Sequence, residues 1–430
     1  MSAQAMKKRI DIADLQIGMF VSELDRPWLE TPFLFQGIEV RCQKDIDELR
    51  QYCKFVYIDT QWVEQLDSPT LRSVRKVPGD PEINEIEQKK IEFEILKKSV
   101  EPHQHTIYED KTTLEEEIEK IGETRQFAQN LISEIMEDVR LGKALRPDLA
   151  KQTVHKISES VIRNPDALIC YSQLKHVHQY TAEHSMRVCV LALVFGRHLG
   201  FEEEQLQALG LGALLHDMGK MKIPLDVLNK PGELTQKEAL LMEEHVPLGV
   251  EILENTTDIP PQSIEVARCH HERFDGSGYK SGLKGDNIGL FGLIGGIVDF
   301  YDAVTSDRVY RKGLPPHVML REMYKLRQRS FDAHLVEQFI QCVGVYPIGS
   351  LVELNTGDIG VVTTMNRQRR LKPRVSLVYR ADQQPYPERR IINLVTDRTP
   401  NGGIYEISTV LEPEHYSINP ADHLPITGVA

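Results

Sequence analysis

The chain has 430 residues, enough for a large hydrophobic core in two or three domains without disulfide or metal staples. Its net charge of −13 opposes loose binding to a DNA or RNA polymer, which is held by a broad basic surface, whereas a small anionic ligand needs only a few local cations. The six cysteines are scattered and form no CxxC pair, which predicts reduced thiols in a cytoplasmic protein. The sequence has no signal-peptide core and no long apolar run, so no membrane span is expected.

The sequence divides into five segments. Residues 1–65 contain short mixed apolar runs and turn residues, which predicts a small α+β domain, a candidate for regulation. Residues 66–112 are charged and lack apolar periodicity, as in a solvated linker with one charged helix. Long helical patterns at 113–345 predict the main domain, and alternation at 346–412 predicts a small β appendage before a frayed tail at 413–430. The predicted fold is therefore mainly α, with small α+β and β additions.

Five histidines lie on helical faces that are otherwise apolar, which costs free energy unless each imidazole has a partner. His184 shares a predicted face with Val188 and Leu191, so it points into the core. His216 and Asp217 follow a buried stripe at the end of the next helical segment, just before a glycine. These three side chains are therefore expected to point inward.

The remaining candidates lie further along the helical segment. His245 follows a capping box formed by Thr235 and Glu238. The predicted buried stripe of this helix consists of Leu241, His245, Leu248 and Ile252. The next predicted stripe consists of Ile264, Ala267 and His271, and it ends in the doublet His270 and His271. Asp299 follows, with Gly295 and Gly296 one turn earlier leaving space around it.

For any one of these residues, a core histidine satisfied by a backbone carbonyl is the simpler interpretation. Five histidines and two aspartates on five helices favour a metal site instead, and imidazole and carboxylate ligands without thiolates suit first-row divalent ions. Seven ligands are too many for one tetrahedral ion and suit two octahedral ions that keep water. Such a centre can hold a bridging hydroxide as nucleophile and clamp phosphoryl oxygens, which predicts phosphoester hydrolysis.

Several cations lie near these residues in the sequence. They are Lys220, Lys222, Arg273, Lys280, Arg308, Arg311 and Lys312. An ordinary solvated face explains most of them. Lys220 differs because it follows the pair His216 and Asp217 within one turn, so it is the candidate that stabilises phosphoryl charge in the transition state.

Four motifs occur in order: HDMGK at 216–220, LNKPGELTQKE at 228–238, HHERFDGSGYK at 270–280 and DFYDAVTSDRVYR at 299–311. Together they resemble the HD-GYP family, a bacterial branch of the HD phosphohydrolases, over about 160 residues. The arrangement also resembles HD-GYP proteins that carry an N-terminal domain of unknown function.

The resemblance implies an HD-type helical bundle that hydrolyses cyclic di-GMP to linear pGpG and, in some members, onward to GMP. It implies two divalent ions, with iron or manganese the habit of the family. One ion would be held by His184, His216, Asp217 and Asp299. The other would be held by His245, His270 and His271 and would share Asp217, while Asp217 and Lys220 would serve catalysis. Substrate contacts are implied for Tyr279, Arg308 and Arg311, and Lys280 adds a cation beside them.

The sequence departs from the family pattern at three positions. Lys280 replaces the proline that names the motif and Val309 replaces another proline, which frees the loop backbone without loss of a ligand. Tyr180 stands where some members carry a glutamate that supports a third metal, which favours two ions.

Two alternative functions stay open from the sequence. One is a signalling or scaffold protein that binds a partner such as a diguanylate cyclase through the loop Gly276–Lys280. The other is a phosphohydrolase for another cyclic dinucleotide or a nucleotide. The oligomeric state is open, with a homodimer as one option.

Overall fold

The structure is a computed structural model. It describes residues 7–17, 19–25, 38–40, 43–59, 108–173, 180–279, 281–306, 312–327, 329–367, 369–416 and 418–426. The chain divides into two compact units, Met1–Asp80 and Pro81–Ala430, and each is described by itself. The predicted linker lies outside the described residues as far as position 107. Lys280, Arg308, Val309 and Arg311 also lie outside them.

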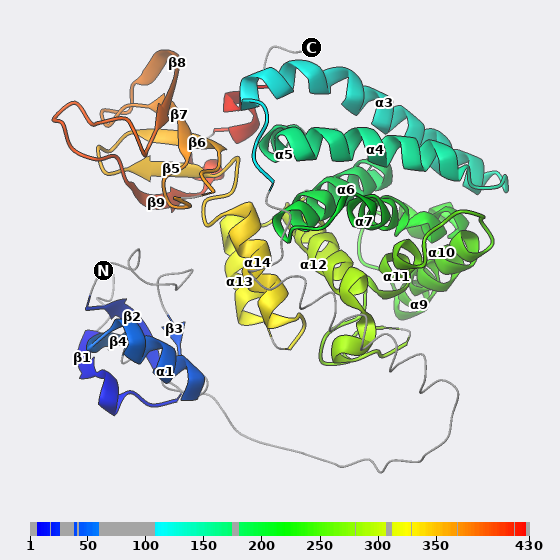
Figure 1. The fold of residues 1–430 in the computed structure, drawn as a ribbon, viewed down its shortest axis with the longest axis horizontal. Coiled ribbons are helices and arrows are strands. Elements are labelled where there is room, and N and C mark those ends of the chain that lie inside the picture. Colours follow the sequence, from blue (N-terminus) through cyan, green and yellow to red (C-terminus); the bar gives the residue numbers. More distant parts are fainter. Residues whose placement is uncertain are drawn as a thin grey trace. The chain divides into compact units, whose positions relative to one another are not determined.

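The first unit contains a small antiparallel sheet and one longer helix (Figure 1). Its elements are β1 (Lys7–Asp11), β2 (Phe20–Leu24), β3 (Ile38–Glu39), α1 (Gln43–Tyr52) and β4 (Phe55–Asp59). The strand order is β1-β4-β2-β3. Ile46 and Leu49 of α1 join Val21 and Val56 of the strands in one buried cluster. Helix and sheet therefore share one core, which confirms the predicted α+β domain.

The second unit is built mainly from helices (Figure 1). They are α3 (Leu114–Arg140), α4 (Pro147–Arg163), α5 (Pro165–Ser172), α6 (Tyr180–His198), α7 (Glu203–Leu215), α8 (Leu225–Leu228), α9 (Gln236–Glu243), α10 (His245–Glu254), α11 (Pro261–Cys269), α12 (Leu290–Thr305), α13 (Pro316–Lys325) and α14 (Ala333–Val343). Helices α6 and α7 pack together, and α4, α11 and α12 pack against them. Phe195 of α6 and Leu209 of α7 are fully buried at this centre, so the helices that carry the candidate ligands share one core.

Two predicted stripes differ from the structure. The helix expected to run through His245 breaks at Glu244, so α9 and α10 are separate and Leu241 is 39% exposed. The buried residues of α10 are His245, Val246, Gly249 and Leu253. In α11 the buried face runs through Val266 and Ala267 to His270, while His271 is partly exposed. The first stripe was wrong because one helix ends before His245 and another begins there, whereas the second is shifted by one residue, from His271 to His270, at the end of α11.

A five-stranded antiparallel sheet follows the helices. Its strands are β5 (Leu351–Leu354), β6 (Ile359–Thr364), β7 (Arg374–Tyr379), β8 (Pro385–Asn393) and β9 (Ile407–Leu411), in the order β8-β7-β6-β5-β9. The sheet is tied to the helices because the buried Asp166 of α5 accepts hydrogen bonds from Met365 N at 3.0 Å and Arg367 Nη2 at 2.6 Å.

The segment after residue 412 differs from the expected frayed tail. It contains a short helix, α15 (Pro413–Tyr416), and a 3-10 helix at Pro420–His423. Leu424 and Ile426 are buried. Removing their apolar side chains from water stabilises this segment against the fold. None of the described helices combines the length and apolar composition needed to cross a bilayer.

Candidate metal centre

All seven predicted ligands come together in the second unit. His184 lies in the first turns of α6, and His216 and Asp217 directly follow α7. His245 is the first residue of α10, His270 caps the C-terminus of α11 with His271 next to it, and Asp299 lies on α12. All except His271 are buried.

One half of the cluster joins two histidines to two carboxylates. His184 Nε2 lies 3.1 Å from Asp299 Oδ1 and 3.6 Å from Asp217 Oδ2. His216 Nε2 lies 3.3 Å from Asp217 Oδ2 and 3.7 Å from Asp299 Oδ1. The four side chains therefore direct donor atoms into one small volume, as a coordination site requires.

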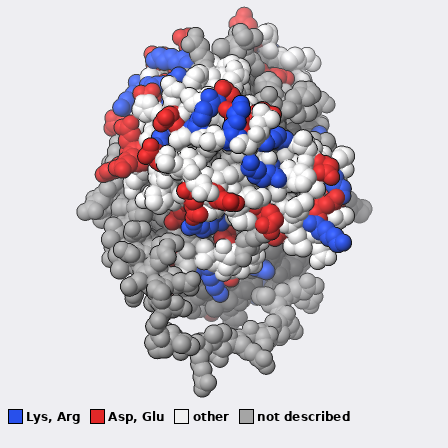
Figure 2. Space-filling model, turned by 90° about the vertical axis from the view of Figure 1, so that its right-hand side faces the viewer, with Lys and Arg blue, Asp and Glu red and all other residues white. Residues whose placement is uncertain are grey.

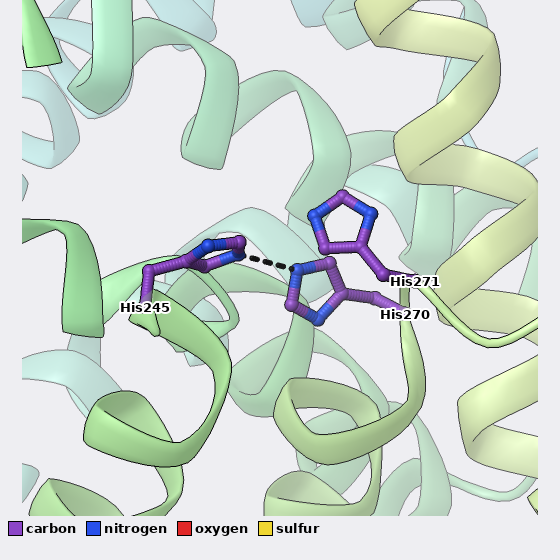
Figure 3. A group of neighbouring side chains, drawn as sticks. All are labelled: His245, His270 and His271. Carbon is purple, nitrogen blue, oxygen red and sulfur yellow. Dashed lines mark hydrogen bonds between the residues drawn. The ribbon is translucent and has the colours of Figure 1, made fainter. Parts of the chain in front are cut away.

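The other half consists of three histidines (Figure 3). His245 Nε2 lies 3.3 Å from His270 Nε2, and the His271 ring lies beside that of His270 with the ring centroids 4.1 Å apart. Asp217 Oδ1 faces this group, at 3.4 Å from His245 Nε2 and 3.8 Å from His270 Nε2. Asp217 thus turns one oxygen toward each half.

Backbone carbonyls orient three of the imidazoles. The Nδ1 atom of His216 lies 2.7 Å from Ala213 O, that of His245 lies 2.7 Å from Met242 O, and that of His270 lies 2.9 Å from Ala267 O. A carbonyl can only accept, so each Nδ1 carries the proton and each Nε2 presents a lone pair. The two Nε2 lone pairs of His245 and His270 face each other, an arrangement that a shared cation would satisfy.

Two buried polar atoms without hydrogen bonds within the described residues are also consistent with a metal site. His216 Nε2 and Asp217 Oδ1 are buried and make no hydrogen bond with any residue in the described part of the chain. Buried acceptors of this kind carry a desolvation cost that a divalent cation would remove. Nitrogen and oxygen donors without sulfur suit a first-row divalent ion, so the residues present fit the predicted metals.

The pKa values of the histidines differ within the cluster. Burial lowers the pKa of His245 to about 4 and that of His271 to about 3, so both imidazoles are neutral at pH 7. Burial by itself would also lower the pKa of His184, but hydrogen bonds to Asp299 and Asp302 raise it to about 9. His184 would therefore give up its Nε2 proton when it binds an ion. Burial alone would raise the pKa of Asp299, yet its hydrogen bond to His184 holds that pKa well below the usual range.

A glycine brings two parts of the centre together. A Cβ atom at Gly219 would lie 1.9 Å from the carbonyl oxygen of His245, so only glycine lets the 3-10 helix Met218–Lys222 approach α10 so closely. Gly296 similarly faces the carbonyl oxygen of His270, which would lie 3.1 Å from a Cβ atom at this position. Gly296 therefore lets α12 approach α11, rather than leaving the open space expected around Asp299.

The glycine-rich loop after His271 lies at the edge of the centre. Tyr279 stacks on His271 with the ring centroids 4.5 Å apart, and Gly278 passes so close that a Cβ atom would lie 2.5 Å from Glu272 Cα. The buried Glu272 accepts hydrogen bonds from Ser281 N at 3.0 Å and Leu283 N at 3.1 Å. Glu272 therefore holds the loop that carries Tyr279, a role that was not predicted from the sequence.

The predicted cations have different surroundings. Lys220 Nζ donates a hydrogen bond to Asp217 Oδ2 and its side chain is 21% exposed, so it lies between the centre and solvent. Lys222 instead donates to Val139 O at 3.1 Å, and Arg273 lies over the rings of Phe300 and Phe331. Figure 2 shows acidic and basic side chains interspersed over the described part of one face.

Two further residues near the centre were not identified from the sequence. Asp302 lies one turn after Asp299 on α12, and its Oδ2 atom is 2.7 Å from His184 Nδ1. Arg187, one turn after His184 on α6, donates to the carboxylate of Asp302. Each of the two lies three residues after a predicted ligand, and residues three apart on a helix share a face. This spacing was the signal in the sequence that could have identified them.

Comparisons with known proteins agree with this geometry. Residues 169–335 match the HD domain, 7–150 match a domain of unknown function (DUF3391) and 351–415 match a KOW domain associated with HD domains. The chain is 34% identical to a cyclic di-GMP phosphodiesterase of Pseudomonas aeruginosa, over 89% of this chain and 88% of that protein.

Other relatives match a smaller part of the chain. A cyclic di-GMP phosphodiesterase response regulator of Xanthomonas campestris is 37% identical over 36% of this chain and 41% of its own length. A 3′3′-cGAMP-specific phosphodiesterase of Vibrio cholerae is 35% identical over 37% of this chain and 31% of its own length.

The fold and the histidine and aspartate cluster define an HD-domain phosphohydrolase, a class that uses divalent metal ions. Within this class, the chain belongs to the HD-GYP family, with the domain of unknown function at its N-terminal end. The resemblance inferred from the four motifs is thereby confirmed.

Proposed function

We propose that the chain is a metal-dependent phosphodiesterase that hydrolyses cyclic di-GMP to pGpG, with GMP as a further product to be tested. The observation that carries the proposal is the convergence of seven imidazole and carboxylate side chains from five helices on one buried site. The Pseudomonas aeruginosa relative, named for cyclic di-GMP hydrolysis, supports this substrate because its similarity extends along nearly the whole chain.

The proposed centre contains two ions, iron or manganese. His184, His216, Asp217 and Asp299 would hold one of them. His245, His270 and His271 would hold the other and share Asp217, a division supported by the opposite directions of the two Asp217 oxygens. When bound, the ions would polarise phosphoryl oxygens and lower the pKa of water.

The chain's own residues would bind and orient the substrate. Lys220 Nζ, held beside Asp217, supplies a positive charge for the phosphoryl oxygens as their negative charge grows. Tyr279 offers an aromatic ring at the edge of the centre, where a guanine base can stack. Substrate contacts by Lys280, Arg308 and Arg311 stay predictions from the sequence.

A related substrate, 3′3′-cGAMP, is the second candidate. A Vibrio cholerae enzyme specific for that dinucleotide is 35% identical over 37% of this chain, and the Xanthomonas campestris relative is 37% identical over 36% of it. These partial matches do not favour either substrate. A scaffold that binds a protein partner through Gly276–Lys280 is the non-enzymatic alternative. The cytoplasmic location and a homodimeric state stay predictions.

The test is anaerobic purification of the full chain, metal analysis, and chromatography of reactions with cyclic di-GMP, 3′3′-cGAMP and pGpG. We expect bound iron or manganese and the fastest turnover of cyclic di-GMP, with pGpG appearing first. Faster turnover of 3′3′-cGAMP would replace the proposed substrate. Stoichiometric metal without any turnover would overturn the enzymatic proposal in favour of the scaffold.

A further inference from the structure

His184 has a different hydrogen-bond partner from the three carbonyl-bound histidines. Its Nδ1 atom faces the carboxylate of Asp302 at 2.7 Å, and both side chains are buried. Arg187 donates to the same carboxylate twice, from Nε to Oδ1 at 2.8 Å and from Nη2 to Oδ2 at 3.1 Å. The paired hydrogen bonds fix the plane of the carboxylate as well as its position.

The position of each histidine in its helix explains the difference. His216 and His270 follow the last residues of α7 and α11, and His245 follows the end of α9. Carbonyl groups in the last turn of a helix lack a partner farther along that helix, so they can accept a hydrogen bond from Nδ1 of these histidines. His184 lies inside α6, where the preceding carbonyls are used by the helix itself, so its Nδ1 requires an acceptor from another element.

We propose that Asp302, held by Arg187, is a positioning residue that directs Nε2 of His184 into the metal centre. The inference rests on the proposed function, because it assigns His184 as a metal ligand. A carboxylate at Nδ1 fixes the tautomer with a free Nε2 and increases the basicity of that nitrogen. Nε2 of His184 indeed faces Asp299 and Asp217, on the side of the ring away from Asp302.

The chain provides a matched control for this pair. Asp166 is also a buried aspartate held by an arginine, with Arg367 Nη2 at 2.6 Å from its Oδ1, and its carboxylate serves to join α5 to the segment after β6. D302N and D166N therefore make the same chemical change in two buried aspartate–arginine pairs. A general effect of breaking such a pair appears in both variants, whereas a metal-positioning effect appears only in D302N.

The experiment titrates Mn²⁺ into the metal-free full chain and measures free Mn²⁺ by electron paramagnetic resonance. We expect D302N to weaken one of the binding steps about 10–100-fold, while D166N keeps the wild-type affinities. Turnover by D302N should recover at saturating Mn²⁺, which a purely structural defect would not do. Wild-type Mn²⁺ affinity in D302N, or an equal loss in D166N, would overturn the proposal.

A second variant keeps the test decisive if D302N does not fold. The double variant D302N/R187Q removes both charges, so no unpaired buried arginine remains. We expect the same loss of Mn²⁺ affinity, and a changed ¹⁵N resonance for Nδ1 of His184 in histidine-labelled metal-free protein. An unchanged resonance with unchanged affinity would contradict the proposal. Wild-type protein that binds Mn²⁺ without hydrolysing cyclic di-GMP would refute the proposed function and leave the comparison of affinities valid.

Discussion

The carboxylate of Asp217 reaches a histidine of a different helix, with Oδ1 at 3.4 Å from Nε2 of His245. Its other oxygen accepts a hydrogen bond from Lys220 and lies 3.3 Å from His216 Nε2. One side chain therefore touches both halves of the cluster and the candidate catalytic cation. Substitutions around Asp217 accordingly separate metal binding from charge stabilisation.

The double variant H216A/D217A should lose metal and turnover together. It removes one donor of the first half and the carboxylate that faces both halves. We expect metal content near background and a fall in kcat/KM of about 1000-fold or more, which corresponds to about 4 kcal/mol of lost transition-state stabilisation. Metal analysis and chromatographic turnover of cyclic di-GMP measure both. H155Q, a change at an exposed histidine of α4, is the control and should retain both properties.

Removal of metal should destabilise the protein. An ion bound by the native centre adds RT ln(1 + [L]/Kd), about 2.7 kcal/mol when free metal is 100 times Kd. We expect chelated protein to melt at a lower temperature and Mn²⁺ to restore both Tm and turnover. Differential scanning fluorimetry of chelated and reloaded samples provides the measurement. Identical melting of the two samples would argue against metal binding in the buried cluster.

K220M should reduce catalysis while keeping the metal. Lys220 donates to Asp217 and is not among the seven predicted ligands, so its loss removes a positive charge near the substrate. A fall in kcat of about 100-fold is expected from the loss of one electrostatic contact to the transition state. The control is K222M, because Lys222 donates to Val139 O on α3. Equal activity of K220M and K222M would remove Lys220 from the proposed mechanism.

E272Q should weaken substrate binding more than it slows the chemical step. Its carboxylate accepts two backbone N–H groups of the loop beyond Tyr279, and a neutral amide is a weaker acceptor. We expect KM for cyclic di-GMP to rise about tenfold with kcat changed less, because a mobile loop costs binding free energy. Steady-state kinetics test this, and unchanged KM would show that the loop does not contact substrate.

A buried ion pair between α3 and α4 should give the fold a defined pH dependence. Glu117 accepts hydrogen bonds from Arg163 Nε at 2.9 Å and from Ser160 Oγ at 2.8 Å. Burial alone would raise the pKa of Glu117, but these bonds hold it below the ordinary value of 4.5. The charged form therefore stabilises the fold above pH 4.5, and this contribution is lost as the pH falls through the lower folded-state pKa.

The variant E117Q tests this contribution. At pH 7 we expect a lower Tm, from a loss of about 2 kcal/mol. The difference in Tm between wild type and variant should shrink as the pH falls from 5 toward 3. E119Q, at an exposed position of the same helix, should match the wild type throughout. A difference that grows toward low pH would have the wrong sign for a lowered pKa.

The sequence predicted the helical domain and the cluster well because both depend on local patterns. Apolar periodicity marked α6 and α7, and the motif around His216 fixed the order of the candidate ligands. The simpler interpretation, a histidine satisfied by a backbone carbonyl, also holds in part for His216, His245 and His270. In each ring Nδ1 donates to a carbonyl, and this leaves Nε2 free for a metal. The predicted buried stripe failed where a helix ended, as at Glu244. Apolar periodicity does not show where one helix stops, and the next helix turns a different face toward the core.

The sequence by itself determined which donor atoms the chain carries and which helices present them. Only the tertiary structure decided how those donors are held: Gly219 lets Asp217 meet His245, and Asp302 replaces a carbonyl behind His184. The physical reason is the range of the interactions. Helical spacing fixes neighbours within one turn, whereas the acceptor that a buried imidazole finds on another helix depends on how the whole core packs.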